Sequence, residues 1–312
     1  YNKKLVTWLD LNLQVALMEY FSGLDEKDKK SQHKKFELIK NLTVWSDLLG
    51  FSNDFCKNGW ILNQEQWEKI DLRLKNFYRQ HYLNISSLNE YIFILNDAVV
   101  RTIPLVYNES SSVMNCYPLN NHIYEISMWI RTVIISHINV NKSDEIGART
   151  VLSYGERFNS FLDEITVDDL VYNYTKRDIN EKSQLAINTG DYTLMHNPRQ
   201  LQMNTALSKS YILESLGSKA GLKGNSFFID KSFFEYIKNI ALNDSILEVI
   251  DEDGLFVIKY VDELEIECNW LMGFDFEKRI KIDKPFETVV YEIKSFYPVD
   301  ENPKKFKFDL II

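Results

Sequence analysis

Two apolar runs joined by a two-residue polar turn constrain the fold more than any other feature of the chain. Residues 91–95 (Tyr-Ile-Phe-Ile-Leu) are large and apolar, Asn96-Asp97 is a turn-forming pair, and residues 98–103 return as a second apolar run. A connection this short joins antiparallel strands, because parallel neighbours need a crossover of about a dozen residues or more. The chain is therefore expected to contain an antiparallel hairpin, which excludes an all-parallel sheet.

The segments around this hairpin alternate between helical and strand patterns. Apolar residues at helical spacing predict helices over residues 13–21, 36–49, 64–81, 121–137 and 201–216. Short apolar runs predict strands over residues 5–11, 150–154 and 227–229, and a second hairpin over 246–260 that turns at Asp253-Gly254. The order is βαββαβ, so we predict an α+β fold: a ferredoxin-like antiparallel sheet with helices on one face, followed by a C-terminal β extension.

The domain organisation follows from where this patterning weakens. Residues 157–200 are polar and poorly periodic, which indicates an insertion that carries loops. The sequence contains neither an internal repeat nor a linker rich in Pro, Gly or Ser. We therefore predict one domain over residues 1–230 that includes the insertion, and a C-terminal α/β extension over residues 231–312 packed on the same domain.

Charge and cysteine content narrow the function classes. The net charge of −9 and the pI near 5.2 argue against a general nucleic-acid binder, although a small anionic ligand needs only a local positive pocket. Cys56, Cys116 and Cys268 lie far apart, which favours a reducing cytoplasm over a zinc site or a disulfide framework. We find no signal segment and no apolar run long enough to span a bilayer, so no membrane partner is expected.

Two carboxylates stand at special positions in the predicted order. Asp10 ends the first predicted strand inside an apolar run, and Asp97 lies at the tip of the hairpin. In a ferredoxin-like sheet the first strand lies beside that hairpin, so the two side chains are expected to converge. Divalent cations relieve the repulsion between close carboxylates, and Mg²⁺ is commonly held by one or two carboxylates plus substrate phosphates. The alternative is that each Asp serves only a strand end or a turn.

Several segments, taken in order, resemble the class III nucleotidyl cyclases. Residues 8–13 (Trp-Leu-Asp-Leu-Asn-Leu) resemble the first strand of that family, and residues 94–99 resemble its metal-binding hairpin. Residues 148–156 (Ala-Arg-Thr-Val-Leu-Ser-Tyr-Gly-Glu) and 206–214 (Ala-Leu-Ser-Lys-Ser-Tyr-Ile-Leu-Glu) are similar to a strand and a helix of bacterial cyclases of the Pycsar anti-phage type. Residues 228–230 and 251–254 are similar to the end of the same domain. The resemblance covers residues 5–260 and rests on the order of the motifs.

The resemblance implies a cyclase core and a set of metal ligands. Asp10, the backbone carbonyl of Leu11, and Asp97 would bind two Mg²⁺ or Mn²⁺ ions. Tyr91 stands six residues before Asp97, where purine cyclases of this class usually carry a base-reading Lys. An aromatic residue there resembles the pyrimidine cyclases and implies UTP or CTP as the substrate, with strand packing as the alternative role for Tyr91.

Three further residues receive roles from the resemblance. Arg149 matches a family Arg that would contact phosphate, with a surface ion pair as the alternative. Lys209 would also contact phosphate and Tyr211 would contact the substrate, from a helix that faces the site across the interface of a homodimer. The alternative is that Tyr211 packs and Lys209 is solvated. The implied product is a 3′,5′-cyclic nucleotide messenger in phage defence, with pyrophosphate released.

Departures from the family pattern keep a non-enzymatic alternative open. Asn12-Leu13 stands where a Gly-Phe pair usually follows the first Asp, and Asn96 replaces the Gly that commonly precedes the second. Ser208 and Ile212 stand where purine cyclases carry an Asn and an Arg. A catalytically degenerate cyclase-fold module that binds a nucleotide or a partner is therefore the second hypothesis.

A third hypothesis comes from a different pair of residues. Arg131 and His137, six residues apart on a predicted helix, loosely fit the Arg-His pattern of HEPN ribonucleases. The neighbouring Ile134 and Ile135 instead favour a buried helix.

Overall fold

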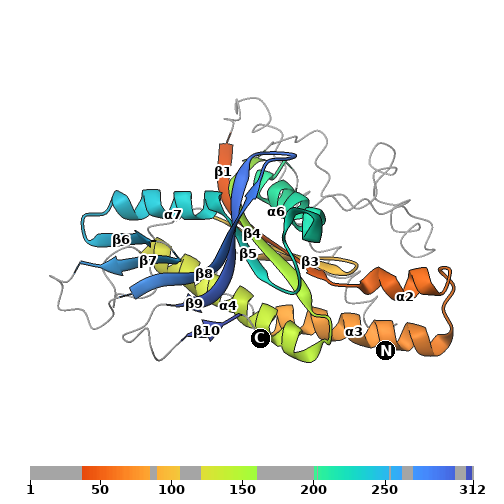
Figure 1. Ribbon diagram of the computed structural model, residues 1–312. Helices are drawn as coiled ribbons and strands as arrows, with labels where there is room; N and C mark the ends of the chain where they lie inside the picture. The colour runs from red at the N-terminus through yellow and green to blue at the C-terminus, as the bar shows by residue number, and fades with distance from the viewer. Residues whose placement is uncertain are drawn as a thin grey trace, which may run out of the picture.

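The computed structural model describes residues 37–84, 90–105, 121–159, 200–201, 203–252, 254–261, 270–298 and 307–310, and these form one ten-stranded sheet with helices packed on it (Figure 1). The strands are β1 (Glu37–Leu48), β2 (Tyr91–Leu95), β3 (Ala98–Pro104), β4 (Ala148–Asn159), β5 (Phe227–Asp230), β6 (Leu247–Glu252), β7 (Leu255–Tyr260), β8 (Trp270–Ile282), β9 (Thr288–Tyr297) and β10 (Phe308–Asp309). The helices are α2 (Phe51–Lys57), α3 (Gln64–Tyr82), α4 (Asn121–Ser143), α6 (Thr205–Leu216) and α7 (Lys231–Leu242), with a 3₁₀ turn, η3 (Gly217–Ala220), after α6.

The sheet is mostly antiparallel, as expected for an α+β fold. Its spatial order is β2-β3-β1-β4-β5-β9-β8-β7-β6, with β10 paired to β9. Among the described strands, β4 and β5 form the one parallel pair. The first part of the described chain runs β1-α2-α3-β2-β3-α4-β4, and its four strands lie in the order β2-β3-β1-β4 with antiparallel neighbours throughout.

The segment over residues 36–49 corrects a prediction, because it forms strand β1 and not a helix. β1 lies between β3 and β4 in the interior of the sheet, and both of its faces are covered. Leu42 and Val44 are buried on one face, and Thr43 between them is buried on the other. The apolar residues Leu38, Leu42, Trp45 and Leu49 also fall at helical spacing, so periodicity alone does not distinguish this strand from a helix.

Helices cover both faces of the sheet, so the prediction of helices on one face is wrong. Leu42 of β1 and Leu152 of β4 belong to a core cluster that also holds residues of α4 and α7. Val151, the neighbour of Leu152, points to the other face and joins a cluster with Leu213 of α6 and Phe228 of β5. Figure 1 shows α3 and α4 along one side of the sheet and α6 on the other. The central strands carry apolar side chains on both faces, and each face has to be covered.

The remaining predicted elements divide between the described and undescribed parts of the chain. The structure confirms the hairpin of β2 and β3, the helices α3, α4 and α6, and the hairpin of β6 and β7. The helix predicted over residues 13–21 and the strand over residues 5–11 lie outside the described residues, as does most of the predicted insertion, residues 160–199. β5 pairs with β9, so the C-terminal strands extend the same sheet. None of the helices within the described residues is both long and apolar enough to cross a membrane.

A candidate carboxylate site beside the hairpin

The residues nearest the hairpin tip form a row across four strands. Leu95 of β2 pairs with Ala98 of β3, Ala98 pairs with Asp47 of β1, and Asp47 pairs with Arg149 of β4. The backbone N–H of Leu48 donates a hydrogen bond to the carbonyl of Asp97 at 2.9 Å. The structure therefore places Asp47 next to Asp97, at the end of the central strand. Asp47 is not among the metal ligands that the sequence predicts, because it lies in a segment whose spacing predicts a helix.

The chain is turned sharply after Asp47 by a glycine. Gly50 has φ +66°, in the left-handed region that favours glycine, and it caps the N-terminus of α2. A Cβ atom at Gly50 would stand 2.9 Å from the side-chain nitrogen of Asn53. The guanidinium of Arg73 donates a hydrogen bond to the Leu49 carbonyl at 2.8 Å and is itself held by Asp144. These contacts fix the backbone on the C-terminal side of Asp47.

The hairpin tip that carries Asp97 is held by α3. Asn96 has φ +57°, a conformation that Asn tolerates better than most residues. The hydroxyl of Tyr78 on α3 donates a hydrogen bond to the Asn96 carbonyl. Burial, together with the negative charge of Asp97, raises the pKa of Tyr78, so its hydroxyl keeps the proton that it donates. Helix α3 therefore holds the backbone of the hairpin at Asn96, the residue before Asp97.

The electrostatics of the row favour a cation. Burial, followed by the charges of Glu214 and Asp97, raises the pKa of Asp47 to about 7 against the opposing effect of Arg149. Burial and the charge of Asp97 also raise the pKa of Glu214, although its ion pair with Arg149 opposes the shift. Three carboxylates thus share a small region with one guanidinium, and a bound divalent cation would relieve their repulsion.

Arg149 lies under α6, where its charge faces carboxylates. Only 8% of the residue is exposed. Its Nη1 atom donates to the carboxylate of Glu214 at 2.9 Å and to the Glu214 carbonyl at 3.2 Å, while its Nε atom has no hydrogen-bond partner. The ion pair is therefore buried, in contrast to the surface pair that the sequence left as an alternative.

The helix α6 reaches this position because β4 carries a glycine. A Cβ atom at Gly155 would lie 2.5 Å from the backbone nitrogen of Ala206 and 2.4 Å from the hydroxyl of Thr205. That hydroxyl is bonded to the backbone of Glu156, donating to its carbonyl at 3.0 Å and accepting from its N–H at 2.8 Å. The Ser-Tyr-Gly-Glu segment of β4 therefore serves the close approach of α6, which brings Glu214 to Arg149.

The other sequence-predicted residues on α6 lie near the row but make contacts of their own. The Lys209 ammonium donates to the Tyr154 carbonyl at 3.1 Å, so it is bonded to β4. The Tyr211 ring packs on the Trp45 ring of β1 with a centroid distance of 4.9 Å and remains 51% exposed. Trp45 stands two residues before Asp47 on the same face of β1. Tyr211 therefore offers an accessible aromatic surface beside the carboxylates.

Tyr91 shares this face of the sheet but lies at the far end of β2. It pairs with Thr102, whereas the Leu95–Ala98 pair adjoins the hairpin tip. Four residues of a strand separate Tyr91 from that pair, a span of about 13 Å. Its side chain is 38% exposed. The structure thus places Tyr91 on the same face as the hairpin tip but away from direct contact with Asp97.

Asp10 and Leu11 lie outside the described residues, so their predicted metal role stays a prediction. The signal that could have identified Asp47 is its context. Gly50-Phe51 follows Asp47 closely, and a Gly-Phe pair is what class III cyclases usually carry shortly after the first metal Asp. That pair was missing after Asp10.

The composition of the site fits a hard cation that brings other ligands with it. Within the described residues, no group of three or more His, Cys, Asp or Glu side chains could hold a metal ion. Mg²⁺ is usually bound by only one or two carboxylates plus substrate phosphates, with water completing the shell. Asp47 and Asp97 therefore match a site completed by a phosphate-bearing ligand.

Comparison with known proteins adds no assignment. A scan of protein-family models finds no match to this sequence, and a search of curated proteins finds no relative.

The geometry of His137 does not support the ribonuclease hypothesis. His137 is only 1% exposed, within the described core. Its Nδ1 atom is hydrogen-bonded to the Thr150 hydroxyl at 2.9 Å and its Nε2 atom to the Asn141 amide at 3.0 Å. A catalytic histidine must reach the proton that it transfers. His137 instead links α4 to β4, as the buried-helix interpretation of residues 131–137 predicts.

Burial of His137 predicts a specific loss of stability in acid. Burial lowers its pKa from 6.5 to about 3, so between these values the unfolded chain binds a proton that the folded chain does not. The stability contribution is therefore present above pH 6.5 and is lost as the pH falls toward 3, by about 1.4 kcal/mol per pH unit. In urea denaturation between pH 7 and pH 5, His137→Gln should show a shallower fall than the unsubstituted protein. Equal slopes would contradict the assignment.

Proposed function

We propose that this protein is a metal-dependent nucleotidyl cyclase whose two metal-binding carboxylates are Asp47 and Asp97. The observation that carries the proposal is their juxtaposition: Asp47 ends the central strand, Asp97 tips the adjacent hairpin, and the charge of Asp97 acts on Asp47. The substrate is a nucleoside triphosphate, and the products are its 3′,5′-cyclic monophosphate and pyrophosphate. Asp47 takes the role that the sequence assigned to Asp10, and the Leu48 carbonyl takes that of Leu11.

The topology supports the proposal at the level of fold. The described order β1-α2-α3-β2-β3-α4-β4, with strands in the order β2-β3-β1-β4, is compatible with the ferredoxin-like βαββαβ unit that we propose, with one additional helix. A class III cyclase core has its first metal carboxylate on the first strand and its second on the hairpin. Since unrelated functions share this fold, the argument depends on the carboxylates and not on the topology alone.

In the proposed reaction the protein binds, orients and balances charge. When bound, two Mg²⁺ or Mn²⁺ ions supply activation of the ribose 3′-hydroxyl and neutralisation of the triphosphate. The 3′ oxygen forms a bond to the α-phosphorus, the bond from that phosphorus to the pyrophosphate oxygen breaks, and the hydroxyl proton leaves to solvent. Asp47 and Asp97 hold the cations, and Arg149 limits the repulsion among the carboxylates from beneath.

The surface next to the carboxylates suits the base and a second subunit. Tyr91, Leu95 and Tyr211 are exposed apolar side chains on the face that carries Asp47. A base extending from the row toward Tyr91 would meet aromatic rings, which suits a flat pyrimidine. Exposed apolar surface of this kind also favours a partner. We propose a homodimer in which this face is covered, with UTP or CTP as substrate and a cytoplasmic role in phage defence, as the resemblance implies.

Incubation of the purified protein with each nucleoside triphosphate and Mn²⁺, followed by chromatography, tests the proposal directly. We expect a cyclic mononucleotide and an equal amount of pyrophosphate, with more product from UTP or CTP than from ATP or GTP. Formation of no cyclic product from any of the four would remove the enzyme hypothesis.

The same experiment distinguishes the degenerate alternative, which one observation favours. Ser208 and Ile212 replace the Asn and Arg of purine cyclases, and the hydroxyl of Ser208 is bonded to the carbonyl of Asn204 on its own helix. If nucleoside triphosphate plus Mn²⁺ raises the melting temperature without turnover, and Asp97→Asn removes that shift, the domain is a nucleotide-binding module that uses the same carboxylates. Ligand binding to the folded state alone raises apparent stability in this way.

A further inference from the structure

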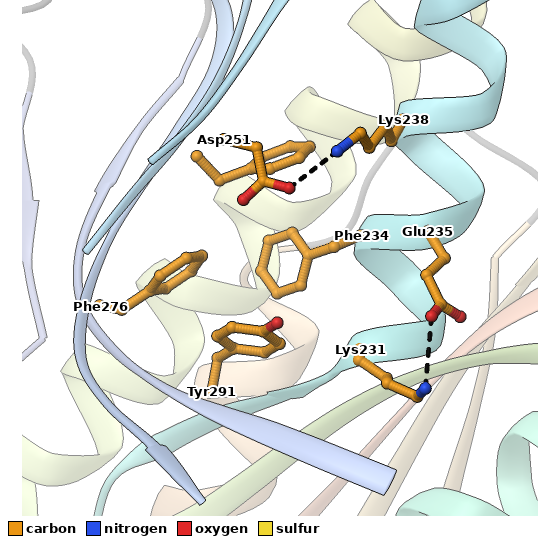
Figure 2. A pocket seen from close by; sticks show the side chains of 8 residues that line it. Lys231, Phe234, Glu235, Lys238, Asp251, Phe276 and Tyr291 are labelled. Carbon is orange, nitrogen blue, oxygen red and sulfur yellow. Dashed lines mark hydrogen bonds and ion pairs between the residues drawn. The ribbon is translucent and has the colours of Figure 1, made fainter. Parts of the chain in front are cut away.

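A second candidate site lies in the C-terminal half of the chain, among elements that do not contribute to the carboxylate row. A cavity of about 270 Å³ lies between one face of α7 and the strands β6 to β9 (Figure 2). The residues that line it include Lys231, Phe234 and Lys238 from α7, and Asp251, Phe276 and Tyr291 from the strands. The helix residues recur at positions i, i+3 and i+7, so they share one face of α7. The pocket is therefore built by elements already fixed in the core.

Aromatic rings form the wall of the pocket. The Phe276 and Tyr291 rings have a centroid distance of 4.7 Å, and Phe234 meets both edge-on at 5.2 and 5.0 Å. Rings at these distances touch one another, so no ammonium group fits between them as in an aromatic cage. The planar guanidinium of Arg279 lies over these rings, 5.9 Å from the centre of Phe276 and 5.5 Å from that of Tyr291. A flat aromatic ring stacked on the same wall would be favourable as well.

An irregularity in β8 directs Phe276 into this space. The pairing of β8 with β9 shifts register on both sides of Phe276. The Phe276 N–H instead donates to the carbonyl of Gly254, in the turn between β6 and β7, at 2.8 Å. Bulges of this kind re-aim side chains and are enriched next to functional sites. The local backbone thus departs from the regular ladder at the residue that lines the pocket.

The rim of the pocket carries charges that a ligand can use. Lys231 pairs with Glu235 at 3.4 Å and Lys238 pairs with Asp251 at 2.9 Å, as the dashed lines in Figure 2 show. All four side chains are exposed, and exposed ion pairs contribute little to stability, so an incoming anion can compete for the lysines.

Two further groups make the pocket receptive to an anion. The guanidinium of Arg279 lies 5.5 Å from the centre of the Tyr291 ring, which adds a third cation beside Lys231 and Lys238. The Tyr291 hydroxyl has no hydrogen-bond partner among the described residues. It is a donor available to a ligand in the cavity.

We propose that this pocket binds a nucleoside monophosphate, with its base stacked on Phe276 and Tyr291 and its phosphate between Lys231 and Lys238. The ribose hydroxyls then donate to the carboxylates of Glu235 and Asp251. An aromatic carboxylic acid would stack on the rings and pair with the lysines. It would have no hydroxyl group to donate to the carboxylates of Glu235 and Asp251. Inorganic phosphate would use the lysines alone. The proposal does not depend on cyclase activity.

Isothermal titration with UMP and AMP, and with uridine and inorganic phosphate as partial probes, tests the assignment. Both nucleotides should bind, because stacking on an aromatic ring tolerates any base. Uridine and phosphate should each bind at least about tenfold more weakly, since each lacks one charge-assisted or stacking contact of about 1.4 kcal/mol. Phosphate binding as tightly as UMP would overturn the nucleotide assignment.

Variants locate the binding. Lys231→Ala combined with Lys238→Ala, and separately Phe276→Leu, should each raise the UMP dissociation constant at least about tenfold. The matched control is Lys281→Ala, which removes an exposed lysine that lies on β8, outside the pocket, and pairs with Asp283. It should leave the UMP dissociation constant unchanged. Asp97→Asn should also leave it unchanged, because that residue belongs to the carboxylate site. Unchanged binding in the double lysine variant, or loss of binding in Asp97→Asn, overturns the proposal whether or not Phe276→Leu folds.

Discussion

Replacement of Asp47 by Asn should abolish cyclic nucleotide formation while making the metal-free protein more stable at alkaline pH. The activity loss is expected to be at least about a thousandfold, which corresponds to about 4 kcal/mol of lost transition-state stabilisation. The amide keeps the size of the carboxylate but loses the charge that holds a divalent cation. Product formation from UTP and CTP with Mn²⁺, measured by chromatography, gives the activity.

The stability effect has the opposite sign because Asp47 is costly to ionise in the folded chain. Burial, Glu214 and Asp97 raise its pKa from 3.8 to about 7, so the folded state retains a proton that the unfolded state has released. The stability linked to this proton is complete below pH 3.8 and is lost as the pH rises toward 7. At pH 8 in EDTA, Asp47→Asn should therefore melt at a higher temperature than the unsubstituted protein, and the difference should shrink at pH 5.

A matched control separates this effect from a general effect of removing a negative charge. Asp71 on α3 is exposed and pairs with Lys75 one helical turn away. Asp71→Asn should change neither the activity nor the pH dependence of melting by a measurable amount. If Asp47→Asn retains full activity, Asp47 is not a metal ligand, and a lower melting temperature at pH 8 would show that its charge stabilises the fold.

Replacement of Glu90 by Ala should cost about 3–5 kcal/mol of unfolding free energy, the largest loss of stability that we expect from a single substitution. Glu90 and Arg101 form an ion pair whose side chains are 1% and 0% exposed. The carboxylate accepts hydrogen bonds from Arg101 at 2.6 and 3.1 Å and from the Trp129 indole at 2.8 Å. Without it, the guanidinium of Arg101 on β3 would stay buried with its charge uncompensated.

Chemical denaturation of three variants tests this explanation. The double variant Glu90→Leu with Arg101→Met removes both charges, and it should recover at least half of the stability lost in Glu90→Ala. Asp71→Ala, which breaks the exposed pair with Lys75, should cost less than about 1 kcal/mol. A double variant less stable than Glu90→Ala would instead show that Arg101 stabilises the core through its other contacts, the Asn84 carbonyl and the hydroxyls of Thr132 and Ser136.

The extent of successful prediction differs between the fold and the site. Local patterns sufficed for the hairpin at Asn96-Asp97, for α3 and α6, and for the turn at Gly254, because each depends on residues close together in the chain. Asp97 was selected for the same reason, as a turn residue between two apolar runs. Its partner Asp47 on β1 could not be predicted in this way, since pairing between β1 and β3 joins residues that are distant in the chain, from Asp47 with Ala98 to Asn41 with Pro104.

The sequence by itself determined the antiparallel hairpin, the acidic and cysteine-poor character of the chain, and the ordered motifs that resemble a class III cyclase. Only the tertiary structure decided that residues 37–48 form a strand inside the sheet, because their apolar residues fit helical spacing as well. The tertiary structure also brings Asp47 to Asp97, Arg149 to Glu214, and Phe276 to the face of α7. In each case the meeting side chains come from distant parts of the chain, and their proximity depends on sheet register and packing.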